Sequence, residues 1–159
     1  KLRGLGFETY APESSASRQF FEVHPHASFT VLLGRIPYHK DTLEGRAGRD
    51  VLTGGAGDDT FVFGVSDIVT GSARDRITDF AAGSDVIDLA AIDADTSTAA
   101  DDGFAFIGTA AFSRHAGELR QVALHGNTVV EGDITGDGRA DFQVLLVGTH
   151  TLNAGDFVL

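Results

Sequence analysis

Residues 45–53 read G-R-A-G-R-D-V-L-T and residues 54–62 read G-G-A-G-D-D-T-F-V, so two nine-residue units stand in tandem. Glycine at the first and fourth places and aspartate at the sixth recur one period apart: Gly45 and Gly54, Gly48 and Gly57, Asp50 and Asp59. One period upstream, Asp41 and Leu43 keep this phase without the glycines. The chain therefore holds two complete repeats and one degenerate copy.

Each unit predicts one turn followed by one short strand. Glycine at the first, second and fourth places lets the backbone adopt positive φ and turn tightly, although Arg46 occupies the second place of the first unit. The apolar eighth residue, Leu52 or Phe61, begins a strand whose side chain points into the core. Stacked units of this kind form a parallel β-roll.

The turns predict a calcium site. Inward-pointing carbonyls and an aspartate form a cage of oxygen atoms, which suits Ca²⁺ better than zinc or copper. The candidate ligands in the two repeats are Gly48, Asp50, Gly55, Gly57 and Asp59. The alternative is a pair of glycine-rich turns with no metal.

An ion in such a roll lies between a repeat and the next but one, so the two complete repeats cannot complete a cage with each other. Asp59 and Gly57 would need the degenerate turn at 36–41. Asp50 would need an oxygen from Asp67 or Asp75. Since such rolls need about three or more repeats for stability, we expect this one to be the end of a longer roll.

Composition narrows the possible partners. Residues 1–44 hold five basic and five acidic residues, so the whole net charge of −11 lies in residues 45–159. An acidic surface repels nucleic acid and anionic membranes. No apolar run reaches the roughly 18 residues that a membrane span needs, and the absence of cysteine excludes a thiolate zinc site.

Because the chain begins at Lys1 rather than at methionine, we expect it to be processed or part of a longer protein.

Beyond the repeats, an ordered series of motifs runs to the C-terminus: T-F-V-F at 60–63, D-R-I-T-D-F-A-A-G-S-D-V-I-D-L at 75–89, A-A-F-S at 110–113, A-G-E-L-R at 116–120, G-D-I-T-G-D-G-R-A-D-F at 132–142 and D-F-V-L at 156–159. With this series, residues 45–159 resemble the C-terminal domain of serralysin-type secreted metalloproteases (peptidase M10), and of RTX proteins more broadly. Residues 1–44 match nothing in that family and stay unassigned, although Phe29–Leu33 predicts a strand.

The resemblance implies an all-β fold: a short parallel β-roll (clean repeats at 45–62) followed by an antiparallel β-sandwich-like cap at 63–159. It implies that Asp75 helps to close the last site of the roll, and that the chain leaves the cell unfolded through a type I exporter that reads Asp156–Leu159. The expected function is a secreted, extracellular calcium-binding module that folds on calcium and supports an upstream domain. A polysaccharide-binding module of an extracellular enzyme is the alternative.

Catalysis by this chain is not expected. The H-E-x-x-H motif of zinc proteases is absent, and His24 and His26 have the wrong spacing with no glutamate between them. Ser113, His115 and Asp156 could be arranged as a hydrolase triad, but no G-x-S-x-G surrounds any serine. The parent protein could still be a zinc metalloprotease through an upstream domain.

The acidic segment at 133–141, near the C-terminus, has two interpretations. Asp133, Asp137 and Asp141 have the alternating spacing of a calcium loop, but no glutamate stands at the twelfth place. We favour a hairpin turn at Asp137-Gly138 between strands at 128–131 and 142–147. The expected core of this region consists of Phe142, Val144 and Leu146 together with Val122, Leu124 and Val129.

Overall fold

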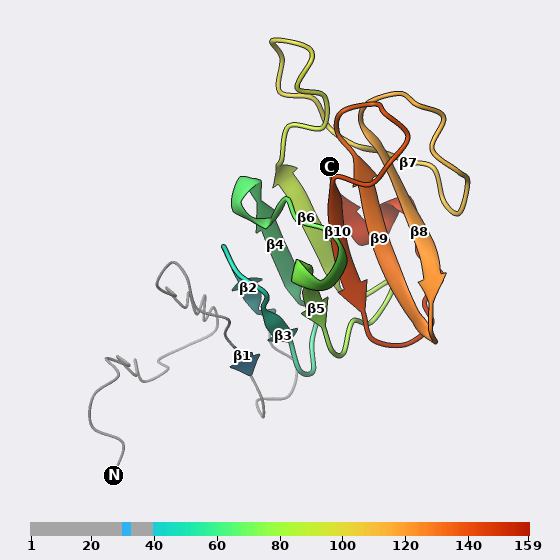
Figure 1. The fold of residues 1–159 in the computed structure, drawn as a ribbon. Helices are drawn as coiled ribbons and strands as arrows, with labels where there is room; N and C mark the ends of the chain where they lie inside the picture. The colour runs from blue at the N-terminus through green and yellow to red at the C-terminus, as the bar shows by residue number, and fades with distance from the viewer. Residues whose placement is uncertain (1–29, 33–39) are drawn as a thin grey trace.

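The computed structural model describes residues 30–32 and 40–159, which form two β-sheets with a shared apolar interior (Figure 1). Sheet A has the strand order β1-β3-β5-β10-β9-β8-β7, and sheet B has the order β11-β6-β4-β2. The strands are β1 (Thr30–Leu32), β2 (Thr42–Glu44), β3 (Val51–Thr53), β4 (Thr60–Gly64), β5 (Asp75–Ile77), β6 (Val86–Ala91), β7 (Ala105–Phe106), β8 (Glu118–Leu124), β9 (Asn127–Asp133), β10 (Phe142–Leu146) and β11 (Phe157–Val158). Three single-turn 3₁₀ helices join them: η1 (Val65–Asp67), η2 (Gly71–Ala73) and η3 (Ala154–Asp156).

The first half is the predicted parallel roll. Strands β2 to β6 alternate between sheet B and sheet A, and each pairs in parallel with the strand one full winding away. The eighth residues of the repeats stack in register, with Leu43 opposite Phe61 and Phe61 opposite Ile87 in sheet B. The winding continues past residue 62, because β5 and β6 pair in parallel with β3 and β4 and are joined through the turn at 82–84. The roll is therefore longer than the two clean repeats.

The second half contains the predicted hairpin. Strand β9 pairs antiparallel with both β8 and β10, and the β9–β10 hairpin is closed by the loop at 134–141. Two parallel pairs join this half to the roll, β10 with β5 and β11 with β6. The all-β fold class is confirmed, with the difference that the cap is mixed rather than purely antiparallel. The physical reason is that β10 and β11 extend the two parallel sheets of the roll.

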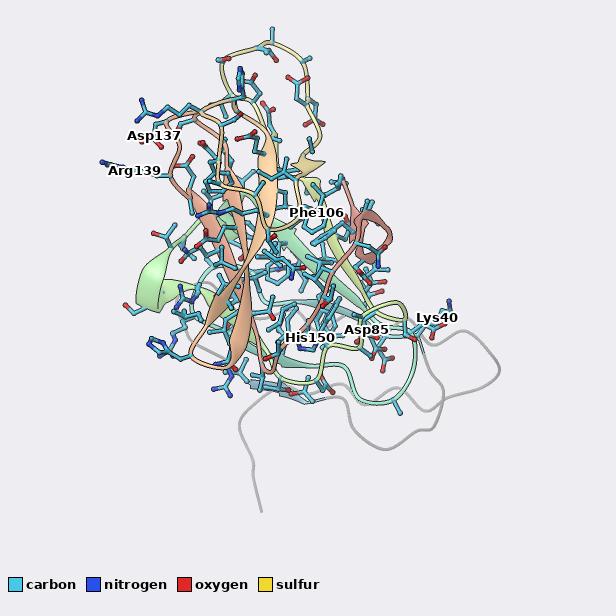
Figure 2. All side chains as sticks on the ribbon, turned by 90° about the vertical axis from the view of Figure 1, so that its right-hand side faces the viewer. Lys40, Asp85, Phe106, Asp137, Arg139 and His150 are labelled. Carbon is cyan, nitrogen blue, oxygen red and sulfur yellow. The ribbon has the colours of Figure 1, made fainter. Side chains whose placement is uncertain are left out.

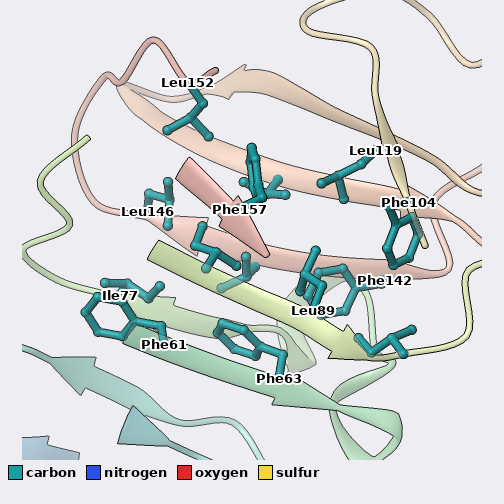
Figure 3. Close-up of a cluster of buried hydrophobic side chains, with 14 of the residues drawn as sticks. Phe61, Phe63, Ile77, Leu89, Phe104, Leu119, Phe142, Leu146, Leu152 and Phe157 are labelled. Carbon is teal, nitrogen blue, oxygen red and sulfur yellow. The ribbon is translucent and has the colours of Figure 1, made fainter. Parts of the chain in front are cut away.

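Apolar side chains from both halves fill one core between the sheets (Figure 3). Phe142, Val144 and Leu146 are fully buried there, as predicted. Val130 occupies this core in place of Val129, which pairs with Val122 and Leu145 on the other face of sheet A. Val129 is itself buried, at 1% exposed, but it and the half-buried Val122 and Leu124 are not part of the core between the sheets. The prediction for these three residues was therefore wrong, because a shift of one residue along a strand turns a side chain to the opposite face.

Residues 1–44 contribute two described strands, β1 and β2. Thr30–Leu32 lies within the predicted strand at 29–33 and pairs in parallel with β3. The degenerate turn at 36–39 and the histidines at 24 and 26 fall outside the described residues. Within the described part of the chain, no helix is long and apolar enough to cross a membrane.

Candidate calcium site

Three aspartates from the turns before sheet B form one row, which we call the first aspartate row (Asp41, Asp59 and Asp85). The Asp41 amide donates to Asp59 Oδ1 at 3.0 Å, and the Asp59 amide donates to Asp85 Oδ1 at 3.0 Å. Each carboxylate thus receives the amide of the turn one winding upstream. Figure 2 labels Asp85 at this end of the roll.

Aspartates from the turns before sheet A form the second aspartate row (Asp50, Asp67 and Asp75). The Asp50 amide donates to Asp75 Oδ1 at 2.7 Å, which repeats the geometry of the first row. Asp67 comes from η1, where its Oδ2 accepts a hydrogen bond from the Gly64 amide at 2.8 Å. The predicted residues Asp50, Asp67 and Asp75 therefore lie close enough to repel one another electrostatically.

The first glycine of each repeat makes room for the aspartate of the same repeat. A Cβ atom at position 54 would lie 2.3 Å from Asp59 Oδ2, and one at position 45 would lie 2.9 Å from Asp50 Oδ2. Neither Gly45 nor Gly54 has positive φ, so the prediction that the first glycine permits a left-handed turn was wrong. Its absent side chain leaves space beside the carboxylate instead.

Positive φ is required at the second and fourth places. Gly55 has φ 96°, whereas Gly48 and Gly57 have φ 147° and 153°. Arg46, at the second place of the first repeat, adopts φ 61°, a left-handed conformation that strains a residue with a Cβ. The substitution of arginine for glycine at this place therefore keeps the turn at a cost in backbone strain.

Four carboxylates of the two rows are removed from water without a basic partner in the described chain. Asp59, Asp67, Asp75 and Asp85 are at most 4% exposed, and no lysine or arginine of the described chain lies within salt-bridge distance of these four. Asp59 Oδ2 is buried and has no hydrogen-bond partner. An uncompensated buried carboxylate is costly, so these groups need a cation or a proton.

Burial shifts the titration of these groups in the direction that this cost predicts. Desolvation, together with repulsion from Asp50 and neighbouring acids, raises the pKa of Asp67 to about 6 and that of Asp75 to about 7. Desolvation also raises the pKa of Asp59 and of Asp85, against backbone hydrogen bonds that lower both. A divalent cation would reverse these shifts by stabilising the charged forms.

Two aspartates of the site were not among the predicted ligands. Asp85 completes the first row downstream of Asp59, where the sequence pointed only to the degenerate turn upstream. Asp79 binds the amides of Gly54 and Gly55 with its two oxygens, at 3.0 and 2.8 Å, and so holds the second repeat's turn. The signal for Asp85 was its spacing in the 75–89 motif, where it stands two residues before the core residue Ile87, as Asp59 does before Phe61. No such spacing marks Asp79, which stands two residues before the exposed Ala81.

The loop at 134–141 uses its aspartates for its own backbone. Asp133 accepts hydrogen bonds from the amides of Gly136 and Gly138, both at 2.8 Å, one at each oxygen. Asp141 Oδ2 accepts from the amides of Ile134 and Thr135, and Asp137 Oδ1 accepts from the amide of Arg139. This geometry favours the hairpin interpretation over a second calcium loop.

No zinc-type or triad geometry is found in the described residues. No three histidine, aspartate or glutamate side chains there surround a common point. Ser113 Oγ lies 2.7 Å from His115 Nδ1, but Asp156 is bound to Gly83 and Asn153 instead.

Because no three acidic side chains of the described residues surround one point, a metal in either row would depend on one or two carboxylates supplemented by backbone oxygens. The residues fit calcium in that sense: all available side-chain donors are oxygens, and Gly54 leaves room beside the unpartnered oxygen of Asp59.

Comparisons with known proteins agree with this architecture. The chain is 42% identical over 91 residues to the metalloprotease AprA of Pseudomonas entomophila (strain L48), a match that covers 56% of this chain and 18% of AprA. The chain thus spans less than a fifth of the length of that relative.

Two solved structures share the fold, both subunits of a mannuronan C5-epimerase of Azotobacter vinelandii. The AlgE6R3 subunit matches 75% of this chain and 62% of its own, with 32% identity and a TM-score of 0.50. The AlgE6R2 subunit matches 76% of this chain and 71% of its own, with 30% identity and a TM-score of 0.52. The sequence profile of the family described as peptidase M10 serralysin C terminal matches residues 39–159, and the chain belongs to that family.

Proposed function

We propose that this chain is a calcium-binding module that folds when it meets calcium and supports a domain upstream of it. The observation that carries the proposal is the buried Asp59 carboxylate, whose Oδ2 has no partner beside Gly54. Asp59 and Asp85 would hold an ion in the first row, and one or two of Asp50, Asp67 and Asp75 would hold one in the second. The turns at Gly48, Gly55 and Gly57 would supply backbone oxygens.

Calcium would supply positive charge beside Asp59, Asp67, Asp75 and Asp85, which have no basic partner in the described chain. At submicromolar calcium the aspartates of both rows repel one another, and the glycine-rich turns lose much chain entropy on ordering. Extracellular calcium modules have a Kd on the order of 10⁻⁴–10⁻³ M, so millimolar calcium would occupy both rows. Because the rows exist only in the folded chain, the free energy of binding adds to the free energy of folding.

This dependence suits a protein that crosses a membrane unfolded and folds outside the cell. The acidic C-terminal tetrapeptide Asp156–Leu159 is the proposed signal for a type I exporter, and the module would be extracellular. The similarity to a much longer metalloprotease supports a catalytic domain upstream. Catalysis is not proposed for the chain itself.

A calcium titration tests the proposal. Circular dichroism and the melting temperature of the 159-residue chain should change cooperatively as calcium rises through about 0.1–1 mM, the range of extracellular modules. Magnesium at the same concentration is the matched control, because it prefers octahedral sites with bound water. An unchanged melting temperature up to about 10 mM calcium would refute the proposal.

The polysaccharide-binding alternative has two observations in its favour. The two similar structures are subunits of an enzyme that acts on mannuronan. On sheet A, the Arg120 guanidinium lies over the Phe112 ring at 4.1 Å and also pairs with Glu131 at 2.8 Å, which forms a small polar and aromatic surface. Binding of mannuronan fragments in calcium, lost in Arg120→Ala and kept in Arg139→Ala, would support this function over a purely structural module.

A further inference from the structure

The end of the chain closes against the turn that carries Asp85. Helix η3 leads into β11, where Phe157 pairs with Ile87 of β6. Asp156 is completely buried, and its Oδ1 accepts a hydrogen bond from the Gly83 amide at 2.6 Å. Its Oδ2 accepts from the backbone and side-chain nitrogens of Asn153 at 2.7 and 2.8 Å. Both oxygens of Asp156 are therefore satisfied by N–H groups of the protein.

Gly83 belongs to a compact turn that orients Asp85. The amides of Ser84 and Asp85 donate to the carbonyl oxygen of Ala81 at 3.0 and 2.8 Å. Asp85 Oδ2 accepts from the Ala81 amide at 2.8 Å, which directs its Oδ1 to the amide of Asp59. The bond from Gly83 to Asp156 attaches this turn to the C-terminal strand.

Asp156 thus continues the first aspartate row by the same kind of contact. In each step, a carboxylate from the downstream segment accepts an amide from the upstream turn: Asp59 from Asp41, Asp85 from Asp59 and Asp156 from Gly83. The last step is one residue out of register, because Asp156 stands one position before Phe157 whereas Asp85 stands two before Ile87. Asp156 therefore reaches Gly83 rather than Asp85.

We propose that Asp156 is a positioning residue for the calcium site of the first aspartate row, and that it sets the affinity of that site by fixing the turn at 81–85. The inference rests on the proposed calcium function. Its effect is confined to the first row, because the second row is joined to a different strand: β5, which begins at Asp75, pairs with β10 rather than with β11.

Residue-resolved NMR of the ¹⁵N-labelled 159-residue chain during a calcium titration tests this assignment. The amides of Asp59 and Gly54 report the first row, and those of Asp50 and Gly45 report the second. In Asp156→Asn, the amide group that replaces one oxygen faces either Gly83 or Asn153 as a second donor. We expect the Kd of the first row to weaken by about tenfold, and that of the second row to stay within about twofold.

Two further variants separate positioning from stability. Asn153→Ala removes one bond to Asp156 Oδ2 and leaves the Gly83 bond, so the first row should weaken by about threefold even if Asp156→Asn does not fold. Asp101→Asn, in the exposed loop before β7, controls for the loss of one negative charge.

The outcomes are distinct. A selective loss of affinity in the first row supports the positioning role. An equal loss in both rows, or none in either, overturns it while the proposed function stands. If the unaltered chain shows no calcium-dependent shifts in either row, the proposed function itself fails.

Discussion

The roll and the half of the chain that contains β8, β9 and β10, which we call the hairpin half, bury carboxylates in opposite ways. In the hairpin half, Asp133 satisfies both oxygens with amides of its own loop, and Glu131 forms a salt bridge with Arg120 at 2.8 Å. In the roll, Asp59 keeps an oxygen without a partner, and Asp75 has no basic neighbour within salt-bridge distance in the described chain. Both halves share one core, so burial alone does not explain the difference.

The hairpin half is therefore electrostatically complete, and the roll is not. Gln143 extends the hairpin network, since its Nε2 donates to Glu131 at 2.6 Å while its Oε1 accepts from Arg74 at 2.7 Å. In the described chain, the buried carboxylates of Asp59, Asp67, Asp75 and Asp85 in the roll have no arginine or lysine within salt-bridge distance. Stability of the roll should therefore depend on a cation and on pH, whereas stability of the hairpin should depend on neither.

Removal of calcium should produce the largest effect. Calcium at about 100 times its Kd contributes about 2.7 kcal/mol for each site, so the loss of two sites approaches the whole stability of a small domain. With a chelator, amide hydrogen exchange in β4 and β6 should accelerate more than exchange in β8 and β9. Equal acceleration in both halves would contradict the claim that only the roll depends on a cation.

A matched pair of aspartate variants tests the difference between the roll and the hairpin half one carboxylate at a time. Asp133→Asn leaves one loop amide without an acceptor, at a cost of about 1–3 kcal/mol with or without calcium. Asp59→Asn can keep its bond to the Asp41 amide while losing the charge. It should destabilise the chain in calcium, and be neutral or stabilising in a chelator, because a desolvated charge is removed. Urea unfolding in both conditions measures the two variants, and the same sign for Asp59→Asn in both would contradict the proposed role.

Without calcium, the free energy of unfolding should depend on pH through the buried aspartates of the roll. Burial raises the pKa of Asp67 to about 6 and that of Asp75 to about 7, above the value of about 3.9 in an unfolded chain. The stabilising contribution of their protonated forms is complete below pH about 4 and is lost as pH rises through 6 to 7. Urea unfolding in chelator from pH 4.5 to 8 should therefore show falling stability.

Calcium should reverse this trend, because the metal binds the deprotonated carboxylates and affinity rises with pH over the same range. A stability in chelator that rises toward pH 8 would show that the two carboxylates are ionised without cost.

The smallest expected effect concerns the second place of the repeats. Arg46→Gly should relieve the left-handed conformation and stabilise the chain by up to about 1 kcal/mol, less the small contribution of the exposed Arg46–Glu44 ion pair. Gly55→Ala should destabilise it by about 1–2 kcal/mol, because Gly55 has φ 96°. Melting temperatures in saturating calcium measure both, and a lower melting temperature for Arg46→Gly would show that its side chain contributes more than its backbone costs.

Local spacing predicted the strands of the roll better than the faces of the hairpin. The nine-residue period placed Leu52 and Phe61 correctly in the core, since each repeat carries its own turn and one apolar anchor. In β9, three successive residues from Thr128 to Val130 are buried, so alternation offers no distinction between the two faces. Pairing with β8 and β10 decides that Val130 faces the core.

By itself, the sequence determined the alternation of turns and strands, the acidic chemistry of the turns and the absence of any cysteine or H-E-x-x-H ligand set. These properties lie within one repeat or one motif, where φ preferences and residue types act locally. Only the tertiary structure decided which carboxylates meet. Asp85 reaches Asp59 across 26 residues and Asp156 reaches Gly83 across 73 residues, because parallel pairing in sheet B brings β4, β6 and β11 side by side. No local preference encodes contacts at such separations, and they exist only once the sheet has formed.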